Sequence, residues 1–140
     1  MTPEEIATRS AEAMWAGDRA SRELGMTLDT VGPGTATLSM TLTESMVNGH
    51  GIGHGGYTFT LADSAFAFAC NSYNRSTVAA AAEIRFRRPT YLGDRLVATA
   101  VERSREGRDG VYDVQVTVGD EVVAVFVGRS KEIGGTLFEH

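Results

Sequence analysis

The chain has 140 residues, a net charge of −5 at pH 7, 42% hydrophobic residues and 22% charged residues, a composition typical of a globular domain with its own core. The negative balance excludes a general basic field for nucleic acid or anionic membranes, and no segment approaches the roughly 20 apolar residues of a membrane span. The chain has no signal-like first segment, and its one cysteine, Cys70, permits no internal disulfide. We therefore expect a single cytoplasmic domain over residues 1–140, with no nucleic acid or membrane partner.

The first predicted element is a short helix that begins at Thr2-Pro3-Glu4-Glu5 and ends near Gly17. Thr2 can cap this helix, Pro3 suits its first position, and Glu5 completes a capping box. Its apolar stripe would be formed by Ile6, Met14 and Trp15.

The rest of the chain predicts six strands and one buried helix. Residues 26–43 form a hairpin, because apolar and polar residues alternate along its second half. Tyr57 to about Asn71 forms a helix that is apolar around almost its whole circumference, which is typical of a buried helix. Four further strands follow, over residues 77–88, 94–105, 111–118 and 121–133. This order predicts an α+β fold in which a curved antiparallel sheet encloses most of the helix and a second subunit covers the remainder.

Asp63 is the only charged residue between Tyr57 and Cys70, and helical spacing places it on a stripe with Phe59, Ala62, Phe66 and Cys70. A buried carboxylate without a partner is unfavourable enough that its pKa rises or it finds a hydrogen bond. Asp63 is therefore either a base or nucleophile, or a structural aspartate bonded to the backbone, to Ser64 or to Thr60. Cys70 is expected to be a small buried hydrophobe rather than a nucleophile.

A glycine-rich segment, NGHGIGHGG over residues 48–56, precedes this helix. Gly55 and Gly56 lie at the predicted helix start, where backbone N–H groups have no internal partner and the helix dipole is positive. These amides could hold a carbonyl oxygen as an oxyanion hole does, or the glycines could simply form a turn without a ligand. His50 and His54 are four residues apart, but the glycines disfavour a helix there and no third ligand is near, so no metal site is expected.

The spacing of Gly55 and Asp63 has a consequence for assembly. Eight residues of helix separate them by about 12 Å along the axis, so one substrate carbonyl cannot contact both within one chain. If both residues serve one reaction, they come from different subunits whose helices pack antiparallel at a dimer interface.

Arginine-rich segments lie outside the predicted helix. The FRRP sequence ends one strand, and Ser104–Gly110 adds further guanidinium groups. These residues are either a solvated strand end or contacts for a phosphate-bearing carrier. The candidate contacts for such a carrier are Arg87, Arg88, Arg105, Arg108, Gly110 and Lys131.

From about Leu24 to Gly135 the sequence resembles the hotdog-fold acyl-CoA thioesterases of the phenylacetate-degradation (PaaI) type. The resemblance rests on NGH and HGG in the glycine-rich segment, LADSAFAFACNS in the helix, and FRRP, GVYD and GRSKEIGG beyond it. It implies a long helix wrapped by an antiparallel sheet, dimers that usually form tetramers, and hydrolysis of an acyl-CoA thioester to free acid and CoA. No cofactor is implied, because CoA is part of the substrate.

Carried onto this sequence, the resemblance implies that Asp63 acts as nucleophile or as base for water and that the partner subunit supplies it. The Gly55 amide would polarise the thioester carbonyl, while Asn48 and His54 would shape the site and hydrogen-bond within it. Many relatives carry a Ser or Thr early in the strand after the helix, whereas residues 78–82 offer no hydroxyl here. The expected acyl group is phenylacetyl, a ring-hydroxylated phenylacetyl or similar, although the helix aromatics could equally be core.

Two alternatives remain open. A hotdog enoyl-CoA hydratase or dehydratase would keep the fold, but its pattern of His and acid residues is not found in this sequence. A non-catalytic acyl-CoA-binding protein would have no need of Asp63.

Overall fold

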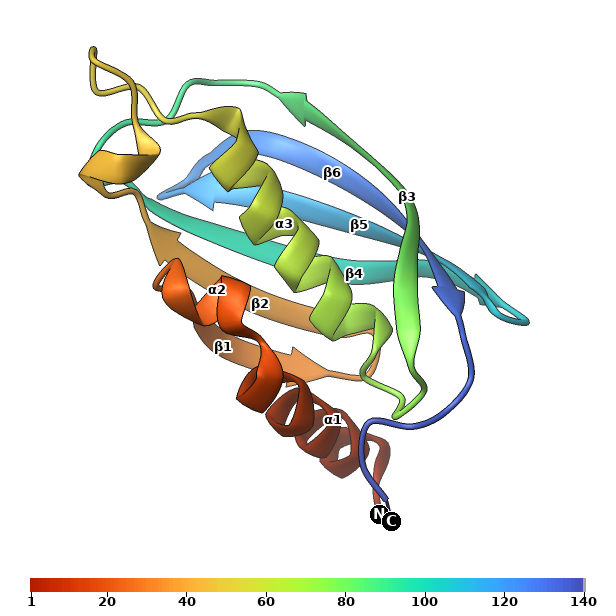
Figure 1. Ribbon diagram of the computed structural model, residues 1–140. Helices are drawn as coiled ribbons and strands as arrows, with labels where there is room; N and C mark the ends of the chain where they lie inside the picture. The colour runs from red at the N-terminus through yellow and green to blue at the C-terminus, as the bar shows by residue number, and fades with distance from the viewer. Residues whose placement is uncertain (140) are drawn as a thin grey trace.

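The computed structural model describes residues 1–139, in which helix α3 (Gly55–Cys70) lies across one face of a curved six-stranded sheet (Figure 1). Every neighbouring pair of strands is antiparallel, and the order across the sheet is β1-β2-β4-β5-β6-β3. The strands are β1 (Thr27–Gly32), β2 (Thr35–Thr41), β3 (Thr77–Phe86), β4 (Arg95–Glu106), β5 (Asp109–Val118) and β6 (Glu121–Glu132). The predicted hotdog arrangement and its six strands are confirmed.

Helix α1 (Pro3–Gly17) forms where the sequence predicts it. The Thr2 hydroxyl accepts a hydrogen bond from the Glu5 amide and the Glu5 side chain accepts one from the Thr2 amide, which completes the capping box. Of the predicted stripe, Met14 and Trp15 are partly buried and pack against the core, while the buried residues of the helix are Ala7, Ser10 and Ala11. Small residues on this face let α1 pack close to β1.

Two short elements are absent from the sequence prediction. Helix α2 (Arg19–Glu23) begins at Asp18, whose carboxylate accepts a hydrogen bond from the Ser21 amide. The 3-10 helix η1 (Glu44–Met46) follows β2. Elements of three to five residues are too short to show a helical period, so the apolar pattern could not reveal them.

The core lies between α3 and the concave face of the sheet. On β2, the alternating residues Ala36, Leu38 and Met40 are buried, as their spacing predicts. Phe66 sits at the centre, with its ring 5.7 Å from that of Tyr112 and 5.9 Å from that of Phe126, measured between centroids. The helix can approach β6 this closely because Gly128 has no side chain: a Cβ there would lie 2.7 Å from Phe66 Cδ1.

Two surfaces of this chain remain open. On α3, the side away from the sheet leaves Asp63, Ser64 and Ala67 only half-buried. At one edge of the sheet, β3 pairs only with β6, and residues 78–82 are all exposed. In residues 1–139, none of the helices is long and apolar enough to cross a membrane.

Gly128→Ala should lower the free energy of unfolding by about 1–3 kcal/mol, because the added methyl group overpacks the contact with the Phe66 ring. Chemical denaturation of the variant measures this change. Gly17→Ala is the matched control, since a Cβ at Gly17 meets no atom within 4 Å. Equal stability of the two variants would contradict the close approach of α3 to β6.

Candidate active site

The glycine-rich segment is held in place by backbone hydrogen bonds to its surroundings. The Gly53 amide donates to the Thr90 carbonyl and the His54 amide donates to the Met46 carbonyl. Within the segment, Asn48 Oδ1 accepts hydrogen bonds from the His50 and Ile52 amides at 2.9 and 3.0 Å. The side-chain carbonyl of Asn48 therefore fixes the shape of the loop that leads into α3.

Helix α3 begins at Gly55, and its N-cap residue is His54, whose backbone is extended. The His54 side chain makes no capping hydrogen bond to the first turn. The backbone N–H groups of Gly55 and Gly56 have no hydrogen-bond acceptor in the described part of the chain. Two free donors at the positive end of a 16-residue helix can stabilise a developing oxyanion.

Phe86, the last residue of β3, packs against Gly55. A Cβ on Gly55 would lie 2.7 Å from Phe86 Cζ, whereas a Cβ on Gly56 would meet nothing within 4 Å. The Phe86 side chain is nevertheless largely exposed, with 56% of the residue accessible. Glycine at position 55 is therefore required by the ring beside it, and that ring forms part of the surface that a substrate would touch.

Asp63 lies two turns further along α3, on its half-buried side. Its carboxylate accepts no hydrogen bond and forms no ion pair within residues 1–139. The two hydroxyls considered from the sequence are engaged elsewhere: Thr60 donates to the Gly56 carbonyl, and Ser64 is hydrogen-bonded to Ser21. Desolvation raises the pKa of the Asp63 carboxyl above its ordinary value. An unpaired carboxylate with a raised pKa is suited to act as a base or nucleophile.

Of the four predicted catalytic residues, the structure places only His54 and Gly55 side by side, at the start of α3, whereas the Asn48 side-chain oxygen is bonded within the loop. Asn48, His54 and Gly55 lie in the segment that enters α3, and the His54 imidazole is exposed. Asp63 is separate, because Gly55 and Asp63 belong to one uninterrupted helix and are about 12 Å apart along its axis. A single chain therefore presents the amide donor and the carboxylate at two different places.

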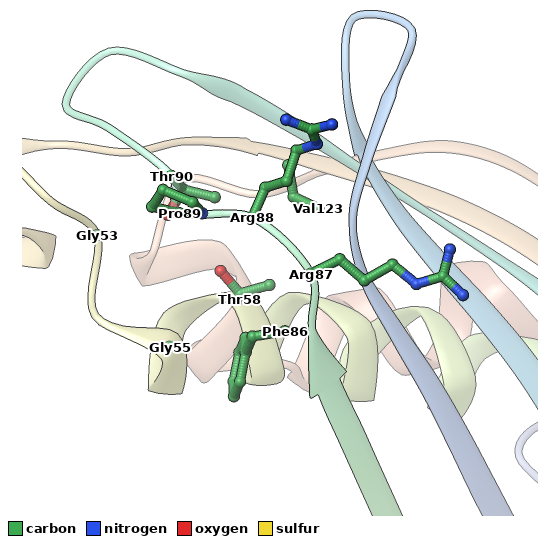
Figure 2. A pocket seen from close by; sticks show the side chains of 9 residues that line it. All are labelled: Gly53, Gly55, Thr58, Phe86, Arg87, Arg88, Pro89, Thr90 and Val123. Atoms are coloured by element: carbon green, nitrogen blue, oxygen red, sulfur yellow. The ribbon is translucent and has the colours of Figure 1, made fainter.

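A cavity of about 400 Å³ opens beside the start of α3 (Figure 2). Gly55 and Thr58 of the helix form one wall, and the segment that follows β3 forms the opposite one. Its lining residues are Gly53, Gly55, Thr58, Phe86, Arg87, Arg88, Pro89, Thr90 and Val123. Thr58, Thr90 and Val123 were not predicted from the sequence. Of these three residues, only Thr58 could have been found from the sequence, because it follows Gly55 by about one helical turn and so lies on the same side of the helix.

The six predicted carrier contacts fall into two groups. Arg87 and Arg88 border the cavity, and Arg88 Nε lies 3.9 Å from a carboxylate oxygen of Glu121. The other four, Arg105, Arg108, Gly110 and Lys131, lie around the β4–β5 turn. A strand of 12 residues spans about 36 Å, so this turn is at the far end of the sheet from the cavity of the same chain.

Cys70 is buried rather than placed in an accessible nucleophile site. Burial raises the pKa of the Cys70 thiol to about 12, which leaves it protonated at neutral pH. This agrees with the expectation of a small buried hydrophobe. Among residues 1–139, no group of three or more His, Cys, Asp and Glu side chains is arranged to hold a metal ion.

Comparison with known proteins assigns this arrangement to a family. The family model described as the thioesterase superfamily matches residues 50–125. The chain is 44% identical over 132 residues to the acyl-coenzyme A thioesterase PaaI of Escherichia coli (strain K12), covering 94% of each chain.

Solved structures agree with the sequence comparison. The structure of the E. coli PaaI protein from the phenylacetic acid degradation operon has a TM-score of 0.94 and 42% identity, covering 96% of this chain and 99% of that one. A mutant of the phenylacetic acid degradation protein PaaI from Thermus thermophilus has a TM-score of 0.80 and 33% identity, covering 83% of this chain and 100% of that one.

Asp63→Asn should raise the melting temperature at pH 7. The folded protein holds the Asp63 pKa above its unfolded value, so ionisation of this group weakens folding as pH rises through the folded pKa. The gain of the variant should therefore shrink as pH falls toward about 3.9, where the unfolded carboxyl is also protonated.

Thermal unfolding from pH 4 to pH 8 measures this difference, with the exposed Asp29→Asn as control. A melting temperature that falls in Asp63→Asn at pH 7 would mean that a stabilising partner holds the carboxylate.

Proposed function

The chain belongs to the thioesterase superfamily, and from this premise we propose that it hydrolyses an acyl-CoA thioester to a free acid and CoA. The observation that carries the proposal is that α3 holds two unsatisfied polar groups. Free N–H donors lie at its start, and an unpaired, desolvated carboxylate lies two turns later. A relative at 44% identity is named an acyl-coenzyme A thioesterase, which supports the same substrate class.

The reaction uses these two groups in complementary roles. The thioester carbonyl oxygen accepts a hydrogen bond from the Gly55 amide, and this hydrogen bond strengthens as negative charge develops on the oxygen. The Asp63 carboxylate either adds to the carbonyl carbon itself or removes a proton from the water that adds there. The carbon–sulfur bond then breaks and CoA leaves as its thiol. If water adds, the free acid forms directly; if Asp63 adds, the acyl group is left on Asp63 as an anhydride, which water hydrolyses to the free acid and the Asp63 carboxylate. His54 orients the substrate beside the Gly55 amide, Asn48 shapes the loop that positions both residues, and the proposed reaction uses no cofactor.

We further propose that the site is shared between two subunits. Two α3 helices that pack antiparallel would bring Asp63 of one chain to Gly55 of the other. This arrangement removes the separation of about 12 Å between the two residues within one chain. The half-buried side of α3 and the exposed small residues of β3 support this pairing. An edge strand with free backbone groups and little side-chain bulk is suited to pair with its own copy. A tetramer would then form from two such dimers with the sheets back to back.

The acyl group proposed is phenylacetyl or a ring-hydroxylated phenylacetyl. The E. coli and T. thermophilus relatives, at 42% and 33% identity, are both described by phenylacetic acid degradation. The helix aromatics contribute less to this choice than the sequence suggested, because Phe66 and Phe68 are core residues.

Asp63→Asn should lower kcat for hydrolysis of phenylacetyl-CoA by about 10²- to 10⁴-fold, because the base or nucleophile is lost. Release of free CoA thiol measures turnover, and calorimetry with a non-hydrolysable CoA thioether measures binding, which should persist. Asp29→Asn, an exposed carboxylate on β1, is the matched control and should keep full activity.

Three outcomes separate the candidate functions. Undiminished turnover in Asp63→Asn would discard the proposed mechanism. Hydration of crotonyl-CoA without CoA release would identify a hydratase. Binding of acyl-CoA by the wild type without any turnover would identify a binding protein.

A further inference from the structure

The cavity beside Gly55 contains two threonine side chains that are almost completely buried. Thr58 is 2% exposed and Thr90 is 5% exposed. Thr58 comes from the first turns of α3, whereas Thr90 comes from the turn after β3, and both line the same cavity. Two distant parts of the sequence therefore place a hydroxyl group on the same small space.

Neither hydroxyl has a hydrogen-bond partner anywhere in residues 1–139, a state that the buried Ser130 shares but that most other buried hydroxyls do not. Ser10 donates to the Ile6 carbonyl at 2.7 Å, and Ser72 donates to the Ala69 carbonyl at 2.7 Å. No fully enclosed side-chain nitrogen or oxygen of the described residues lacks a partner, so the two threonine hydroxyls are reached through the cavity. Figure 2 shows the Thr58 oxygen pointing away from α3 toward Pro89 and Thr90.

The chemistry of the cavity restricts what can occupy it. A hydrocarbon acyl chain would leave both hydroxyls without hydrogen-bond partners, which is unfavourable for buried polar groups. A phosphate would need cationic partners, but the Arg87 and Arg88 guanidinium groups extend away from the cavity interior (Figure 2). A neutral group that both donates and accepts hydrogen bonds, flanked by short apolar segments, fits the hydroxyls together with the walls formed by Phe86, Pro89 and Val123.

We propose that Thr58 and Thr90 form the subsite for the amide of the pantetheine arm of CoA that lies nearest to the thioester sulfur. This inference rests on the proposed hydrolysis of acyl-CoA and assigns one part of the substrate to this cavity. The arm enters past Arg88, its amide bonds to the two hydroxyls, and the acyl group lies on the other side of Gly55, outside the cavity.

The spacing along α3 agrees with this placement. Thr58 follows Gly55 by three residues, which is about 4.5 Å along the helix axis and on nearly the same face. In CoA, two methylene groups separate the sulfur from the nearest amide nitrogen. A thioester carbonyl at the Gly55 amide therefore sets that amide beside Thr58, and the methylene groups pass the Phe86 ring.

Three thioesters of the same acid test the subsite, one each with CoA, N-acetylcysteamine and ethanethiol. The first two carry the amide at the same distance from sulfur, and the third has none. Thr58→Val, which keeps the shape and removes the hydroxyl, should lower kcat/KM about tenfold for the first two thioesters and less than twofold for the third. Thr58→Ser is the matched control and should retain the wild-type preference. Thr90→Val should show the same selective loss, which keeps the test available if one variant folds poorly.

An equal loss on all three thioesters would overturn the inference and assign Thr58 to the reacting carbonyl or to the attacking water. Unchanged kcat/KM on the CoA and N-acetylcysteamine thioesters in both valine variants would overturn it as well. Absence of turnover by the wild-type protein on every thioester would instead refute the proposed function, and the subsite with it.

Discussion

The fixed rise of one α-helix is the constraint on which the account of this protein depends. Gly55 and Asp63 lie in a single uninterrupted helix, so the chain holds a free amide donor and a carboxylate about 12 Å apart and cannot bring them closer. The helix is also held close to the sheet, because the Phe66 ring of α3 occupies the space that a side chain at Gly128 of β6 would need. The proposed reaction therefore needs a second copy of the helix, and the open side of α3 and the open edge of the sheet are where that copy fits.

The same helix contains a carboxylate whose burial is unfavourable for folding, and its proposed role in the reaction explains why it is there. Asp63 is desolvated and unpaired, although Thr60 and Ser64 stand beside it with hydroxyls that could have bonded to it. Those hydroxyls are committed to the Gly56 carbonyl and to Ser21 of α2, which leaves the carboxylate free. The threonines of the cavity are likewise unpaired, and because they line an open cavity their hydroxyls are available to a substrate.

Much of the fold could be predicted because it follows from local patterns. The alternation in β2 and the capping box of α1 each specify their element within a few residues, and the apolar run of α3 requires a surrounding sheet. Asp63 was detectable as the lone charge in that run. The glycine-rich segment indicated a helix start, but it did not reveal that the side-chain carbonyl of Asn48 would be used inside the loop.

What could not be predicted depends on tertiary contacts between distant residues. Thr90 and Val123 reach the cavity from turns and strands far from Gly55, and no local pattern marks them. The need for glycine at position 55 comes from the Phe86 ring on another element. The sequence alone suggests one set of arginine contacts for a phosphate-bearing carrier. In the structure, the antiparallel strands place Arg105 and Arg108 at the opposite end of the sheet from Arg87 and Arg88.

Subunit complementation tests the shared site most directly. Asp63→Asn keeps the donor, and Gly55→Ala keeps the carboxylate while its new Cβ collides with the Phe86 ring. Each variant alone should be nearly inactive in CoA release. A purified heterodimer of the two should recover about half of the wild-type kcat, because one of its two sites combines an intact Gly55 with an intact Asp63 of the partner subunit. A heterodimer no more active than its inactive parents would contradict a site built from two chains.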